Sequence, residues 1–268
     1  MLSLSKKTYY TNDNIPYLIN TYIREYDLRK AGQSALLVAG CIDRKQYEYL
    51  CSLPREQRQI QTGLLLRDNP YFVEASKSTI AKARESFVEA NGLRDWDILS
   101  VKNDAIYVIA KQPVVTSFAD GILEFVSKNV YTSYYRYFRT EMYYFYNAIT
   151  NEETIDIKNI GDNKLALHRE FMLDFLMYLF NMAQTSDIKQ VISTITGMID
   201  QYVNLQLPLG YYREFNALSQ YRFNISEWTT YQAEFLPEDM DKSMLDIGQN
   251  LDLLRYLAKI YSEVYFTN

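Results

Sequence analysis

A tight β-hairpin is the feature that most constrains the fold of this chain. Two runs rich in apolar and β-branched residues, Ile98–Val101 and Ala105–Ala110, flank a Lys-Asn-Asp turn that ends at Asp104. Asp104 therefore stands where the second strand begins. The strands would fix its carboxylate while the hairpin tip leaves it open, and carboxylate oxygens are the ligands that Mg²⁺ prefers.

A second carboxylate follows another strand-like run, Tyr22–Asp27. Asp27 and Asp104 are far apart in the sequence, so only the fold could bring them together. Two aspartates carried by neighbouring strands are how a two-metal phosphoryl-transfer site is built. The sequence thus predicts a divalent-metal site at the ends of two strands.

Composition and charge narrow the class of protein. A chain of 268 residues with 48% hydrophobic and 23% charged residues is expected to fold, as one large domain or two lobes. The 25 tyrosines could pack against partners or stack on bases, or could reflect an AT-rich genome; composition leaves both readings open. The net charge of −5 argues against a strongly basic nucleic-acid footprint but allows a locally basic cleft.

Cysteine and histidine usage excludes several kinds of site. Cys41 and Cys51 are too few for a disulfide framework, and the single histidine, His168, excludes a Cys/His zinc site and disfavours a Ser-His-Asp triad. This usage indicates a reducing, intracellular setting. The longest apolar run, Ala35–Ile42, is far too short to span a membrane, so no membrane partner is expected.

The chain is predicted to be an α+β protein with two parts. Residues 1–160 would form a domain around an antiparallel sheet, with a short helical insertion at about 31–92, and residues 161–268 would form an all-helical domain. Apolar periodicity predicts helices over 33–39, 43–51, 54–66, 71–90 and two further segments before a long C-terminal helix. Strands are predicted over residues 15–28, 98–101, 105–110, 122–126, 131–137, 142–146 and 154–157.

Four short motifs in this order resemble family B DNA polymerases. Glu25–Ser34 is similar to motif A, and Lys102–Val108 is similar to motif C, Asp-Thr-Asp-Ser-Ile-Tyr-Val, with Asp104 at the second aspartate. Ser127–Tyr131 resembles the Lys-Lys-x-Tyr segment, and Ile155–Ile160 resembles the Lys-Gly-Ile element that leads into the thumb. Lys102 departs from the pattern by replacing the first aspartate of motif C. The fingers motif Lys-x-x-x-Asn-Ser-x-Tyr-Gly has no match.

The resemblance implies a palm-like domain, a thumb-like helical domain and no exonuclease domain. It implies template-dependent nucleotidyl transfer with Mg²⁺, or Mn²⁺ in its place, in phage or mobile-element replication. Partners would be primer–template nucleic acid, nucleoside triphosphates and other replication proteins. The protein would act in the cytoplasm, which for a phage protein is the cytoplasm of the host cell. The implied catalytic and metal-binding residues are Asp27 and Asp104; the nucleotide-binding residues are Lys45, Arg55 and Arg58; the nucleic-acid-binding residues are Lys128, Tyr131 and Lys158.

Two other functions remain open on the sequence alone. A non-catalytic scaffold or host-takeover binding protein with a degenerate palm-like fold fits the missing motif C aspartate and the acidic net charge. A nuclease could use the same carboxylates with water as the nucleophile. In the non-catalytic case Asp104 is a turn residue and Asp27 is a strand-end charge.

Overall fold

The computed structural model describes residues 7–158, 169–204, 206–207 and 237–267. The chain divides into two compact units. Unit 1 comprises residues 1–15 and 21–131, and unit 2 comprises residues 16–20 and 132–268. Each unit contains its own antiparallel sheet and its own hydrophobic core.

Unit 1 is built on a six-stranded sheet in which every pairing is antiparallel. The predicted hairpin forms its centre, where Lys102 pairs with Ala105 and Asn103 takes a left-handed backbone conformation (φ 53°), which asparagine tolerates better than most residues. In spatial order the strands are β1 (Tyr9–Thr11), β4 (Ile98–Lys102), β5 (Ala105–Ile109), β3 (Ile23–Leu28), β7 (Leu123–Tyr131) and β6 (Ser117–Phe118).

The helices of unit 1 separate β3 from β4 in the sequence, as the predicted insertion requires. Asp43 caps α2 with a capping box, and Pro70 occupies the first turn of α4, where its missing N–H costs nothing. A short 3-10 helix, η2 (Asp95–Asp97), leads into β4. The α-helices are α1 (Ala31–Val38), α2 (Arg44–Ser52), α3 (Arg55–Asp68) and α4 (Pro70–Ala90).

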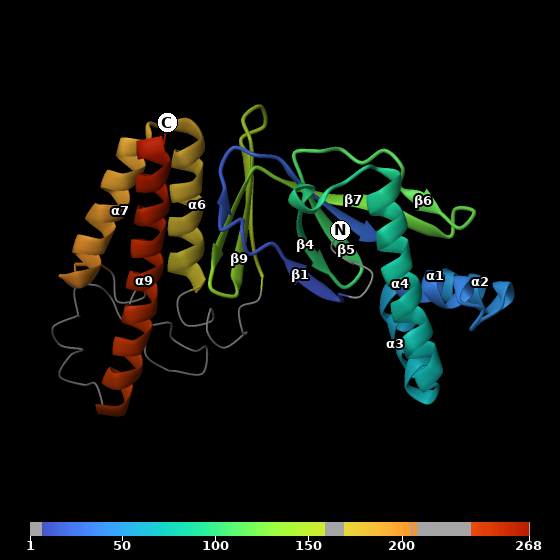
Figure 1. Ribbon diagram of the computed structural model, residues 1–268. Helices are drawn as coiled ribbons and strands as arrows, with labels where there is room; N and C mark the ends of the chain where they lie inside the picture. Colours follow the sequence, from blue (N-terminus) through green and yellow to red (C-terminus); the bar gives the residue numbers. More distant parts are fainter. Residues whose placement is uncertain (1–6, 159–168, 205, 208–236, 268) are drawn as a thin grey trace. The chain divides into compact units, whose positions relative to one another are not determined.

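Helices α1 and α4 cover one face of the sheet (Figure 1). Residues of β3 alternate between the two faces, so Tyr26 and Leu28 enter this core while Glu25 and Asp27 point to the opposite face. Phe87 of α4 packs on both Tyr26 and Phe125, with ring centroids 5.3 and 4.6 Å apart. The apolar face anchors the strands, and the opposite face carries Glu25 and Asp27.

Unit 2 combines a four-stranded antiparallel sheet with three described helices (Figure 1). The strand order is β10 (Glu152–Lys158), β9 (Thr140–Asn147), β8 (Ser133–Tyr137) and β2 (Tyr17–Leu18). The helices are α6 (Arg169–Thr185), α7 (Ile188–Val203) and α9 (Pro237–Thr267).

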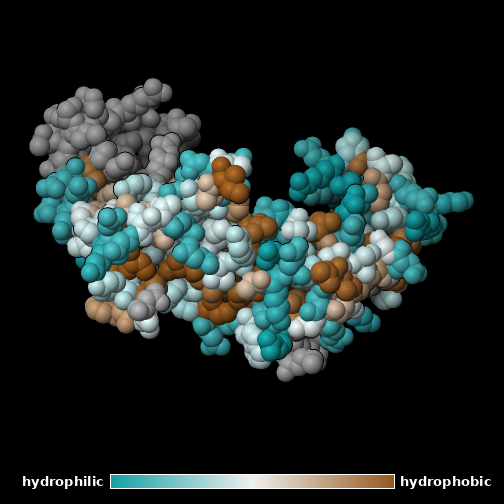
Figure 2. All heavy atoms as spheres, turned by 90° about the horizontal axis from the view of Figure 1, so that it is seen from above, coloured by the Kyte–Doolittle hydropathy of each residue, from teal (hydrophilic) through white to brown (hydrophobic). Residues whose placement is uncertain are grey.

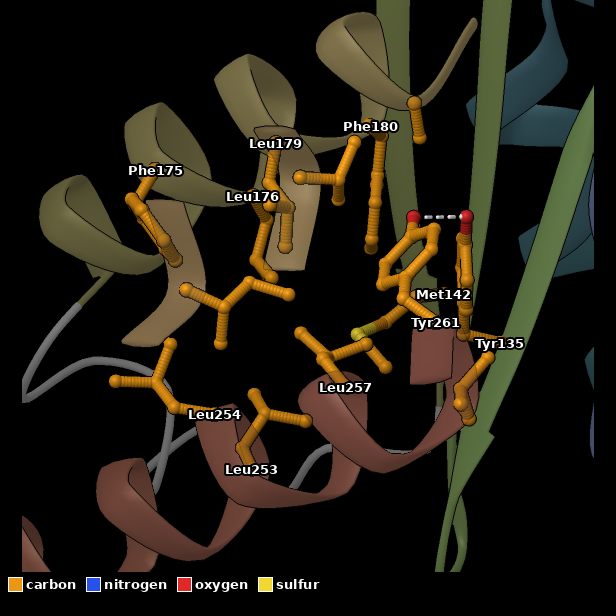
Figure 3. Close-up of a cluster of buried hydrophobic side chains, with 14 of the residues drawn as sticks. Tyr135, Met142, Phe175, Leu176, Leu179, Phe180, Leu253, Leu254, Leu257 and Tyr261 are labelled. Atoms are coloured by element: carbon orange, nitrogen blue, oxygen red, sulfur yellow. Dashed lines mark hydrogen bonds between the residues drawn. The ribbon is translucent and has the colours of Figure 1, made fainter. Parts of the chain in front are cut away.

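The core of unit 2 lies between its sheet and these helices (Figure 3). Phe180 of α6 stacks on Tyr135 of β8 with a centroid distance of 4.3 Å and an interplanar angle of 8°. The Tyr135 and Tyr261 hydroxyls share a hydrogen bond of 2.5 Å inside this core, so neither phenol is buried without a partner. Part of the tyrosine content therefore serves to pack the core of unit 2.

Three details of the predicted organisation differ from the structure. The division falls between Tyr131 and Thr132, not near residue 160, because β8, β9 and β10 form the sheet of unit 2; that unit is therefore not all-helical. The predicted strand over 15–28 is two strands, and its first part, β2, pairs with β8 in unit 2. Residues 127–129, predicted to separate two strands, lie inside β7.

None of the helices in the described part of the chain is long and apolar enough to cross a membrane. On the face seen in Figure 2, hydrophobic residues form separate groups among hydrophilic ones.

Candidate functional site

Strand pairing in unit 1 brings Asp27 and Asp104 to the same end of the sheet. Strands β3 and β5 are neighbours, Asp27 lies opposite Ala105, and the Leu28 N–H donates to the Asp104 carbonyl oxygen at 3.1 Å. Asp27 therefore lies in β3 beside the turn that carries Asp104, directly before β5.

The charge of Asp27 influences the ionisation of Asp104. Burial raises the pKa of Asp104 above its ordinary value, and the negative charge of Asp27 raises it further. Lys128 and Arg84 act in the opposite direction without reversing the shift. Two mutually repelling carboxylates of this kind would favour a cation between them.

Lys128 approaches these acids because of a β-bulge. Glu25 pairs with Asn129 and Tyr26 pairs with Ser127, so Lys128 is the extra residue of β7 at this point. Its Nζ lies 3.4 Å from Asp27 Oδ2 and 3.8 Å from Glu25 Oε1. The bulge thus directs an ammonium group to the face of the sheet that carries the carboxylates.

Glu25 is the buried centre of this polar cluster. The Tyr107 hydroxyl donates to Oε1 at 2.9 Å, while Asn129 Nδ2 and the Tyr131 hydroxyl donate to Oε2 at 2.6 and 3.1 Å. The side chain of Glu25 is only 3% exposed, so these hydrogen bonds replace its hydration. They also fix the carboxylate in one position.

Arg84 of α4 supports the hairpin turn from inside the protein. One of its guanidinium nitrogens donates to the Asn103 carbonyl oxygen, and another donates to the Lys7 carbonyl oxygen at 2.8 Å. Burial lowers the pKa of Arg84, and the charge of Asp104 opposes this shift. Arg84 therefore holds the loop that positions Asp104.

The predicted nucleotide-binding residues are not brought to this cluster by any contact that the structure shows. Lys45 lies on α2 and Arg55 lies on α3, both exposed. Arg58 donates to the Leu53 carbonyl oxygen at 3.3 Å, a contact within the helical insertion. Their predicted role has no structural support in unit 1.

The predicted nucleic-acid-binding residues have different environments. Lys128 joins the cluster, whereas Lys158 belongs to unit 2, where its Nζ pairs with Asp156 Oδ2 at 3.1 Å. Tyr131 is buried, and its hydroxyl is committed to Glu25. The buried ring of Tyr131 offers no face on which a base could stack.

Sequence reasoning missed Glu25 and Arg84 as parts of the site. Glu25 carries a usable signal, since it stands two residues before Asp27 and must share its face of the strand. Arg84 carries none, because its helix contacts the hairpin only through the tertiary fold. His168 lies outside the described residues.

A divalent cation would find few protein ligands in this site. Within the described ranges, no three His, Cys, Asp or Glu side chains are arranged so that they could hold a metal ion. Mg²⁺ is commonly bound through one or two carboxylates, with waters and substrate phosphates completing its coordination. Asp27 and Asp104 fit that donor set, so the residues present are compatible with Mg²⁺.

The fold and the site define a mixed α/β protein with antiparallel sheets and a buried carboxylate cluster on one sheet face. The chain belongs to the bacteriophage PBS1 gene 130 protein family, whose model matches residues 1–262. No curated protein matches the chain. The family match supports the expected phage origin.

Proposed function

We propose that this protein is a Mg²⁺-dependent nucleotidyltransferase that extends a primed nucleic acid during phage replication in the host cytoplasm. The observation that carries the proposal is the position of Asp27 and Asp104 at the same end of two neighbouring antiparallel strands. The raised pKa of Asp104, caused by burial and by the charge of Asp27, adds to it. The order of the three polymerase-like motifs in unit 1, Glu25–Ser34, Lys102–Val108 and Ser127–Tyr131, supports a palm-like role for this unit.

Each residue of the cluster has a role in this proposal. Asp27 and Asp104 would hold Mg²⁺, which when bound activates a hydroxyl group and neutralises a triphosphate. Lys128 would pair with phosphate oxygens through its ammonium group. Arg84 would keep the Asp104 turn in place, and the Glu25 network would keep β3 and β7 in register.

Primer extension with purified protein tests the proposal. The reaction contains a labelled primer–template, MgCl₂ and either all four deoxynucleotides or all four ribonucleotides, so that the same experiment identifies the sugar preference. We expect extension that requires both Mg²⁺ and template. Shortening of the labelled primer would favour the nuclease alternative, because water would then be the nucleophile.

One observation favours a second, non-catalytic function. The Lys128 ammonium already forms ion pairs with both Asp27 and Glu25, as expected of a cluster that only stabilises the sheet. In that case the protein would act as a phage scaffold or host-takeover binding protein with a degenerate palm-like fold. Absence of both extension and degradation, at any Mg²⁺ concentration, would favour this function.

A further inference from the structure

Lys128 occupies the place beside Asp27 where a metal cation would be attracted. Its Nζ lies within 4 Å of two carboxylates, with distances of 3.4 Å to Asp27 and 3.8 Å to Glu25. The bulge in β7 creates this arrangement, because a regular strand would not place Lys128 on the same face as its neighbour Asn129.

We propose that the Lys128 ammonium is a built-in counterion that competes with a divalent cation for Asp27. When the cation binds, Lys128 leaves Asp27 and keeps its contact with Glu25. This inference rests on the proposed function, since it concerns the same carboxylates. It assigns to Lys128 the control of metal affinity in the free protein.

The two carboxylates differ in the way this exchange requires. Glu25 is 3% exposed and fixed by hydrogen bonds from Tyr107, Asn129 and Tyr131, so it stays in place when the lysine moves. Asp27 is 30% exposed and is therefore the carboxylate that a hydrated cation can reach.

The lysine itself can move. Its side chain is 54% exposed, and the flexible aliphatic stem lets the ammonium turn away from Asp27 at little steric cost. In its displaced position the ammonium still has Glu25 as a partner and can face the phosphates of an incoming nucleotide.

Thermal denaturation of the full chain in increasing MgCl₂, at constant ionic strength, tests the inference. We compare wild type with Lys128→Gln and Lys128→Arg. Lys111→Gln is the matched control, because Lys111 pairs with Asp97 at 2.7 Å elsewhere in unit 1 and loses the same charge. Asp27→Asn shows which part of the Mg²⁺ effect belongs to this site.

In Lys128→Gln the MgCl₂ concentration that gives half of the maximal stabilisation should fall about tenfold. This is near the low end of the change in cation affinity that removal of a unit charge about 4 Å away causes at a partly exposed site. Lys128→Arg and Lys111→Gln should keep the wild-type value, and Asp27→Asn should lose the response. An unchanged half-point in Lys128→Gln, or no response to Mg²⁺ in any protein, overturns the inference. Primer extension on the same samples is a separate readout: absence of extension with the tenfold shift intact would refute the proposed function alone.

Discussion

Removal of the Glu25 carboxylate should strongly destabilise unit 1. In Glu25→Ala the Tyr107 and Tyr131 hydroxyls and the Asn129 amide lose their common acceptor on the face of the sheet. Water reaches this place poorly, because Glu25, Tyr107 and Tyr131 are all buried. The donors would remain unpaired unless the strands moved apart.

The magnitude follows from the number of orphaned donors. A buried donor left without a partner costs about 1–3 kcal/mol, so loss of three hydrogen bonds should lower the free energy of unfolding by roughly 3–9 kcal/mol. Glu25→Gln should cost less, about 1–3 kcal/mol, because the amide keeps one acceptor oxygen and can donate to a tyrosine hydroxyl. The control, Glu124→Ala, breaks an exposed ion pair with Arg29 and should cost about 0–1 kcal/mol.

Urea denaturation followed by tryptophan fluorescence measures these differences. The chain has two tryptophans, so Trp228→Phe leaves Trp96, directly before β4, as the reporter of unit 1. We expect the order wild type, Glu124→Ala, Glu25→Gln, Glu25→Ala, from most to least stable. If Glu25→Ala were as stable as Glu124→Ala, the hydrogen-bond network would not hold the strands as described.

Two further changes test the electrostatics of the site and the core of unit 2. Because the pKa of Asp104 is raised in the folded protein, the stability contributed by protonated Asp104 should be lost as the pH rises from about 4 through that raised pKa. Asp104→Asn should lack this loss and, without metal, should melt at the same temperature as wild type or higher; thermal melts from pH 3.5 to 8 measure this, and a parallel loss in both proteins would contradict it. Phe180→Ala should cost about 3–5 kcal/mol because it empties the stacked site beside Tyr135. Phe138→Ala, at a side chain 80% exposed, should change stability by less than about 0.5 kcal/mol in the same denaturation assay.

Local signals made the helices and the central hairpin predictable. The helix starts at Asp43 and Pro70 and the turn before Ala105 depend on residues close in sequence. The neighbouring positions of Asp27 and Asp104 were also predictable in outline, because each ends or begins a strand-like run.

Other features depend on contacts between distant segments and could not be predicted from sequence. The bulge that directs Lys128 to Asp27 arises from the pairing of β7 with β3, and composition suggested a break there instead. Strand β8 pairs with β2 in unit 2, although β2 directly precedes β3 of unit 1 in the sequence. The hydrogen bond from the Tyr131 hydroxyl to Glu25 joins residues far apart in the chain.

Single-turnover nucleotide incorporation with Mg²⁺ tests the central claim most directly. Asp104→Asn and Asp27→Asn are compared with Asp120→Asn, an identical change at an exposed turn between β6 and β7 of the same sheet. We predict that the first two variants lose incorporation by at least about 10³-fold while remaining folded, and that Asp120→Asn keeps the wild-type rate. An active Asp104→Asn protein would contradict the assignment of Asp27 and Asp104 as the metal-binding carboxylates.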